Sequence, residues 1–160
     1  MIDQSIKVRT GTPADIDDVM RIAIAACEDN ALCPPNPEKL LRDIWPALNL
    51  DKGIMGVIGS PIEAAILLRI ENLWYSDELM MIERSIFVDP TFRSAKGGRA
   101  KLLCEYAKVA AKELGLKLII GIISNERTEG KIRLYHRAFG EPSGAYWVWG
   151  GQTGLKAVSP

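Results

Sequence analysis

The stretch that decides the fold reads Ile86-Phe87-Val88-Asp89-Pro90-Thr91-Phe92-Arg93-Ser94-Ala95-Lys96-Gly97-Gly98-Arg99-Ala100-Lys101-Leu102-Leu103. An apolar β-strand ends at Pro90, and adjacent glycines then lead into an amphipathic helix. Glycine lets a backbone approach a ligand closely, and the unpaired amides of a helix start attract anions. The turn carries four cations and no acid: Arg93, Lys96, Arg99 and Lys101. This pattern favours a phosphate-binding turn, and a solvated basic loop is the alternative.

Apolar spacing on either side of this turn predicts a mixed sheet with helices on both faces. Strands are expected at 6–9, 54–58, 62–70, 80–88, 117–123 and 145–149. Helices are expected at 13–27, 37–48, 97–114 and 128–138. Thr12 and Pro13 suit the start of the first helix, and Gly115 suits the end of the third.

Length and composition indicate one globular domain, 1–160, because 48% of its 160 residues are hydrophobic and 25% are charged. Lysine plus arginine equals aspartate plus glutamate, 20 against 20, so nucleic acid is not an expected partner. No apolar run reaches the ~20 residues of a membrane span, and the N-terminus does not resemble a signal peptide. Three cysteines without a C-x-x-C motif and one histidine argue against disulfides and zinc. We therefore expect a cytoplasmic protein with reduced thiols, no metal and no membrane partner.

Several of these motifs resemble the GNAT family, the Gcn5-related N-acetyltransferases. Val88 to Arg93 is similar to the V-x-P-x-x-R sequence at the end of the family's fourth strand. The glycine part differs, because Lys96 takes the first glycine position counted from Arg93 and Gly98 takes the second. Leu134-Tyr135 and Phe139-Gly140 resemble the family's closing motif, with the final Gly-Phe reversed.

The resemblance implies a GNAT-like α+β fold, with a mixed, mostly antiparallel sheet of about seven strands and about four flanking helices. In the family the fourth and fifth strands part, and acetyl-CoA lies between them. Carried over, the main chain of Ile86, Phe87 and Val88 would pair with the pantetheine arm. The pyrophosphate would be held by Arg93, Ser94, Ala95, Lys96, Gly97, Gly98, Arg99 and Ala100. Asn125 would either contact the cofactor or cap the next turn.

Two residues are candidate catalysts for the attack of an amine on a thioester. Tyr135 matches the family tyrosine that protonates the departing sulfur, although a tyrosine in a helix is also a common core residue. Glu83 lies on the fourth strand, where some family members place a glutamate base. Strict alternation would put Glu83 on the same face as Ser85 and Phe87. Burial there would raise its pKa, whereas the alternative is a surface ion pair with Arg84 or Arg69.

The resemblance thus implies an acetyl-CoA-dependent N-acetyltransferase that acts directly on a primary amine of a small molecule or peptide. The alternative is a GNAT-like module that binds CoA without catalysis and serves regulation or interaction. The basic side of the last helix would either reach an adenosine phosphate or form a solvated face. Trp45 and Trp74 are candidates to line the acceptor pocket. Trp147 and Trp149 share one face of the last expected strand, which suits either the core or a homodimer contact.

Overall fold

The computed structural model describes residues 6–93, 98–123 and 128–150. Its strands and long helices follow one another as β1 (Val8–Thr10), α1 (Ile16–Asn30), α2 (Pro37–Leu48), β2 (Gly53–Ile58), β3 (Ala64–Asn72), β4 (Leu79–Val88), α3 (Arg99–Leu114), β5 (Leu118–Ile119) and α4 (Thr128–Phe139). Two short 3-10 helices, η1 (Pro13–Asp15) and η2 (Pro90–Phe92), precede α1 and follow β4. None of the helices in these described ranges is both long and apolar enough to cross a bilayer.

The strands form one mixed sheet in the order β1-β2-β3-β4-β5. Neighbours from β1 to β4 are antiparallel, and β5 runs parallel to β4. The expected mixed, mostly antiparallel α+β architecture with four helices is therefore confirmed. The expectation of about seven strands was wrong, because the described residues form five.

The expected strand at 145–149 is not a strand in the structure. Its side chains are exposed instead of packed, and Trp149 is 96% exposed. Alternation gives a segment two faces, but a strand also needs a neighbouring strand edge for its backbone hydrogen bonds. The sequence of 145–149 shows the alternation, but it cannot show whether a strand edge lies beside the segment.

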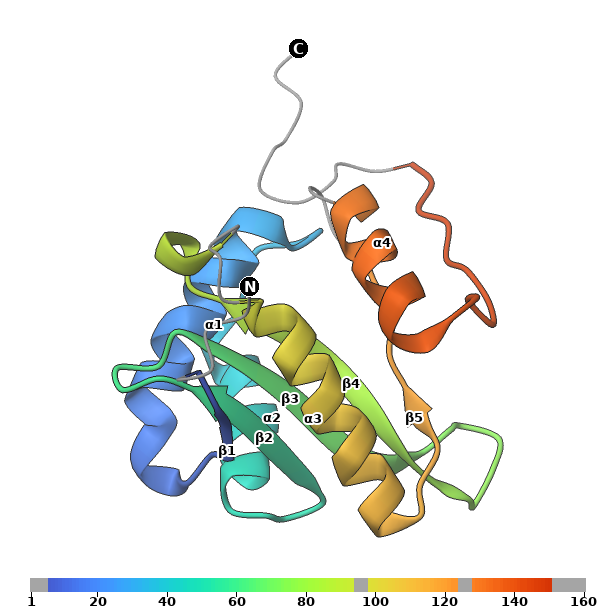
Figure 1. Cartoon of the computed structure of the whole chain (residues 1–160), viewed down its shortest axis with the longest axis horizontal. Helices are drawn as coiled ribbons and strands as arrows, with labels where there is room; N and C mark the ends of the chain where they lie inside the picture. The colour runs from blue at the N-terminus through green and yellow to red at the C-terminus, as the bar shows by residue number, and fades with distance from the viewer. Residues whose placement is uncertain (1–5, 94–97, 124–127, 151–160) are drawn as a thin grey trace.

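Helices cover both faces of the sheet, and each face has its own core (Figure 1). On one face, α1 and α2 bury Ile22 and Ile44 against β2 and β3. On the other face, α3 buries Leu103 and Ala107 against the same strands. Gly115 ends α3 in the left-handed conformation that glycine adopts most easily, with φ 66°, as the sequence predicts.

The start of α1 is fixed by a carboxylate in η1. Asp15 accepts hydrogen bonds from the Thr12 amide at 2.8 Å and from both terminal nitrogens of Arg9, at 2.7 and 2.8 Å. The Arg9 guanidinium lowers the pKa of Asp15 to about 2, with help from the Thr12 amide. These contacts join β1 to the beginning of α1.

A β-bulge interrupts the alternation of β4. Ser85 pairs with Leu67 and Glu83 pairs with Leu68, so Arg84 has no partner on β3. Because directly opposed residues point to the same face, Glu83 lies with Leu68 on the α3 side of the sheet. The expectation that Glu83 shares a face with Ser85 and Phe87 was wrong, because one extra residue shifts the alternation.

The sheet opens between its last two strands. β5 pairs with β4 only at Met81 and Ile82, although β4 continues to Val88. Residues 120–123, part of the expected strand at 117–123, pair with no strand in the described structure. The expected separation between the fourth and fifth strands is therefore confirmed, and it positions the site described next.

Candidate active site

A cleft of about 1740 Å³ lies where β4 and the chain after β5 separate. Residues 82–88 of β4 form one wall, residues 119–123 face them, and α4 contributes seven of its residues. The start of α3 lines the cleft from one face of the sheet, and the connection between α1 and α2 lines it from the other. Elements on both faces of the sheet therefore contribute side chains to the cleft.

The α3 end of the cleft is a helix N-terminus preceded by glycine. Gly98 adopts the left-handed conformation, with φ 59°, directly before α3 begins at Arg99. In the part of the chain that the structure describes, no acceptor is found for the amides of Arg99, Ala100 and Lys101. The positive end of a 16-residue helix favours an anionic ligand.

Two arginines of the turn hold it to the rest of the fold. Arg93 donates from Nε to the Val88 carbonyl at 3.1 Å and pairs with Asp29 of α1. Arg99 donates from Nε to Glu63 at 2.8 Å and lies over the Phe92 ring. Both guanidinium side chains are only 10–12% exposed. The structure thus gives these arginines an anchoring role, and their contact with a phosphate stays a prediction.

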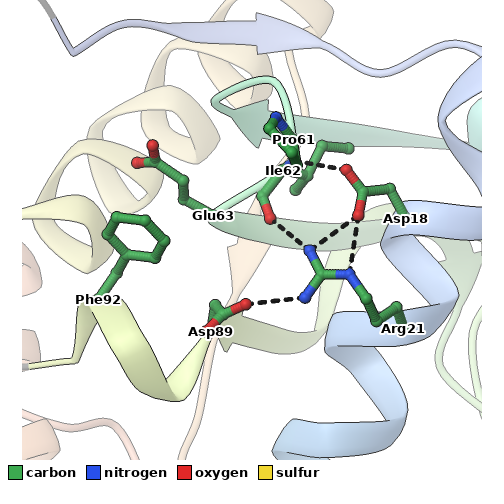
Figure 2. A pocket seen from close by; sticks show the side chains of 7 residues that line it. All are labelled: Asp18, Arg21, Pro61, Ile62, Glu63, Asp89 and Phe92. Atoms are coloured by element: carbon green, nitrogen blue, oxygen red, sulfur yellow. Dashed lines mark hydrogen bonds and ion pairs between the residues drawn. The ribbon is translucent and has the colours of Figure 1, made fainter.

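A smaller pocket of about 430 Å³ shows how the beginning of the turn is anchored (Figure 2). In it, Arg21 of α1 contacts Asp18, the Ile62 carbonyl and Asp89, each at 2.8–2.9 Å. The Asp89 amide also donates to the Glu63 carbonyl at 2.9 Å. The β2–β3 connection therefore holds the turn at Asp89 and, through the Glu63 side chain, at Arg99. Sequence inspection missed this network, because its members are up to 68 residues apart.

The other cofactor-binding candidates fall into two groups. Ile86, Phe87 and Val88 line the cleft on the part of β4 that β5 does not pair. Ala100 also lines it, at the start of α3. The candidates that lie outside the described residues are Ser94, Ala95, Lys96, Gly97 and Asn125.

Glu83 projects into the gap between the two parted strands. Its carboxylate accepts a hydrogen bond from the Gly121 amide at 3.4 Å. Burial raises the pKa of Glu83 from 4.5 to about 7, although the Gly121 amide and the Lys131 charge act in the opposite direction. A carboxyl group with this pKa gains and loses a proton near neutral pH. The surface ion pair considered for Glu83 is not formed, since Arg84 pairs with Asp43 and Glu71.

Tyr135 lines the same cleft from α4. Its ring packs edge-to-face against Phe139, with centroids 5.8 Å apart. Burial raises the pKa of Tyr135, and the nearby Glu83 carboxylate raises it further. The phenol therefore keeps its proton at neutral pH. Lys108 of α3 holds the end of α4 by donating to the Ala138 carbonyl at 2.9 Å.

Three other side chains of chemical interest lie outside this arrangement or are inert within the fold. Cys104 is buried, and burial raises the pKa of its thiol to about 12, which makes it a poor nucleophile. His136 does not line the cleft and lies 3.6 Å from Glu141. Trp74 is 95% exposed and contacts Tyr75 edge-to-face, away from the cleft lining.

Several solved structures share this architecture, and some of them are named as acetyltransferases. A possible acetyltransferase from Clostridium difficile 630 is 17% identical, with a TM-score of 0.64 over 91% of this chain and 97% of that chain. The aminoglycoside acetyltransferase AAC(6')-Iy, solved with a bisubstrate analog of CoA, is 16% identical, with a TM-score of 0.66 over 92% and 98%. An integron cassette protein from the Cole Harbour salt marsh metagenome is 21% identical, with a TM-score of 0.68 over 96% and 91%.

Comparisons at the level of sequence give no match. No family model matches the chain, and no curated protein matches it. At 16–21% identity, the likeness to solved structures defines the fold of the chain and leaves its activity to be argued from the site. The chain has the GNAT acetyltransferase fold that its sequence led us to expect.

Proposed function

We propose that the protein is an acetyl-CoA-dependent N-acetyltransferase that transfers the acetyl group directly to a primary amine. One observation carries the proposal: Glu83 and Tyr135, a proton acceptor and a proton donor, line the cleft that parts β4 from β5. That cleft ends at the amide-rich start of α3. The chain shares its fold with several solved structures named as acetyltransferases.

The residues of the cleft suit the chemistry of acetyl-CoA. The unpaired edge of β4 at Ile86, Phe87 and Val88 offers backbone groups to the amides of the pantetheine arm. The start of α3, with Lys101, offers amides and positive charge to the diphosphate. Cations of α4 on the cleft, Lys131, Arg133 and Arg137, suit a further phosphate. When bound, acetyl-CoA supplies an acyl group activated as a thioester.

The two candidate catalysts divide the proton transfers between them. Glu83 removes a proton from the acceptor amine, and a base with a pKa of about 7 is partly ionised at neutral pH. Tyr135 donates its phenolic proton to the sulfur as the carbon–sulfur bond breaks. The acyl group passes directly to the amine in this scheme. Cys104 takes no part, because it lies outside the cleft lining and its thiol has a pKa of about 12.

Two measurements on the purified protein test the proposal. The melting temperature should rise by several degrees with saturating acetyl-CoA, because a ligand that binds only the folded state stabilises it. Release of free CoA, followed with a thiol reagent, should then depend on added primary amine, and mass spectrometry should find the acetylated amine. Stabilisation without release of CoA by any amine would instead indicate a CoA-binding module. If acetyl-CoA neither raises the melting temperature nor is converted to free CoA, the whole proposal is contradicted.

A further inference from the structure

The end of the cleft opposite α3 is where an acceptor would enter, if the proposed function is correct. It is formed by the end of α1, the connection at 31–36 and the beginning of α2. These elements cover the face of the sheet opposite α3. A ligand with its phosphates at Lys101 would therefore leave this end of the cleft open to a second substrate.

The acceptor end has a mostly apolar lining. Its side chains include Ala26, Cys27, Leu32, Pro34 and Leu40. Leu32 and Leu40 are half-buried, so part of their surface faces the cleft. An apolar lining of this kind binds the hydrocarbon body of a ligand and offers few hydrogen-bond partners to a polar ligand.

Carboxylates are few in the lining and are already engaged. Among the described residues, the carboxylates on the cleft are Asp43, Glu83 and Glu129. Asp43 accepts a hydrogen bond from Arg84 at 3.0 Å, and Glu129 lies 4.0 Å from Arg133. Glu83 is the proposed base. Apart from Glu83, each described carboxylate of the lining therefore already has an arginine neighbour.

Cations are more numerous than acids in the lining as a whole. The described lining holds eight: Lys39, Arg84, Arg93, Arg99, Lys101, Lys131, Arg133 and Arg137. At the acceptor end Lys39 has no carboxylate partner among the described ion pairs, whereas Arg84 is paired with Asp43 and Glu71. A ligand that brought several positive charges to this end would be repelled by Lys39.

We infer that the acceptor is a small primary amine with a single amino group on an apolar body. Polycationic amines, such as polyamines and aminoglycosides, are disfavoured, because this end presents Lys39 and, apart from the proposed base, no described carboxylate without an arginine neighbour. The inference distinguishes the chain from one protein of the same fold, an aminoglycoside acetyltransferase from soil that was solved in complex with sisomicin.

A competition between matched amines tests the inference. Specificity constants, kcat/KM, would be measured with 2-phenylethylamine and hexylamine as apolar monoamines, and with spermidine and kanamycin as polycations. We expect the monoamines to exceed the polycations by at least about tenfold. If spermidine or kanamycin is the better substrate, the inference is overturned and the proposed acetyl transfer stands. If acetyl-CoA binds and no amine releases CoA, the proposed function and the inference both fail.

A charge reversal at the acceptor end adds a second test. Lys39 is exposed, so Lys39→Glu should fold normally while placing a carboxylate where the amine enters. We expect it to lower the preference for 2-phenylethylamine over spermidine by about fivefold. Lys7→Glu makes the same change beside β1, at the opposite edge of the sheet, and should leave this ratio unchanged. An unchanged ratio in Lys39→Glu would overturn the argument from charge.

Discussion

The amide of Gly121 donates a hydrogen bond to the carboxylate of Glu83 across the gap between β4 and the chain that follows β5. This contact, at 3.4 Å, is made where the two strands no longer pair. It orients the carboxylate into the cleft, while burial keeps the pKa of the group near 7. The same separation of the strands thus opens the cleft and creates the environment of the proposed base.

The raised pKa of Glu83 predicts the pH dependence of catalysis. A base must be ionised to act, so kcat should rise with pH through an apparent pKa of about 7. Glu83→Gln should lower kcat by about 100-fold and remove this limb of the profile. Any limb that reflects ionisation of the acceptor amine itself should remain in the variant. A wild-type limb that persists in Glu83→Gln would assign the titration to another group.

The same raised pKa predicts how folding stability depends on pH. The folded state binds the Glu83 proton more tightly than the unfolded chain, so the contribution to stability is fully present below about pH 4.5 and is lost as pH rises through about 7. Glu83→Gln removes this loss, and its stability relative to wild type should increase by about 2 kcal/mol between those values. Urea unfolding of both proteins at pH 5 and pH 8 measures the difference. Equal changes in the two proteins would contradict the burial of this carboxyl group.

Tyr135 is expected to act on catalysis without holding the fold together. Tyr135→Phe keeps the ring contact with Phe139 and removes only the phenolic proton, so kcat should fall by about 100-fold with little change in melting temperature. Tyr75→Phe, at an exposed ring outside the cleft lining, is the matched control. Full activity in Tyr135→Phe would show that the thiolate leaves without this acid.

Charge at the start of α3 is expected to control the affinity for CoA. Lys101 is exposed and lines the cleft, so Lys101→Glu should raise the Kd for CoA by about fivefold in low salt. The difference should shrink as salt screens the charges. Lys112→Glu, in the last turn of the same helix, should bind CoA as the wild type does. Isothermal titration calorimetry at two salt concentrations measures all three proteins, and equal loss in both variants would remove the phosphate contact from the proposal.

The contact between Asp15 and Arg9 predicts a pH dependence of stability that is independent of function. Its pKa is lowered in the folded state, so its contribution to stability is present above about pH 4 and is lost as pH falls through about 2. Arg9 is partly exposed, so Asp15→Asn should cost only about 1 kcal/mol at pH 7. Urea unfolding at pH 7 and pH 2.5 should show the two proteins converging at the lower pH. A constant difference would show that the ionised form of Asp15 is not what stabilises the fold.

Local signals in the sequence predicted most of the elements. The apolar run ending at Pro90, the glycines before Arg99 and the final Gly115 each act within a few residues, so a linear sequence displays them. Long-range pairing is different. Arg84 contacts Asp43, which is 41 residues away, and no local pattern announces that partner.

Two of the predictions were wrong for the same physical reason. Alternation of apolar and polar residues does not show which strand a segment pairs with, or in which register. Residues 145–149 alternate but have no strand edge beside them. Glu83 alternates with Ser85 in sequence, yet the register skips Arg84, and the two side chains lie on opposite faces. The resemblance to a family supplied what alternation could not, namely the place where the sheet parts.

The extra residue in β4 divides the strand into two halves of opposite alternation. Before Arg84 the odd positions face α3, and after it the even positions do. Deleting Arg84 would leave Glu83 and Ser85 adjacent and still opposite Leu68 and Leu67, which are consecutive on β3. Phe87 would then keep its place in the core beneath α1, and Glu83 would stay on the cleft. Arg84 is thus an insertion whose removal would break the ion pairs with Asp43 and Glu71 and leave the proposed base on its face of the sheet.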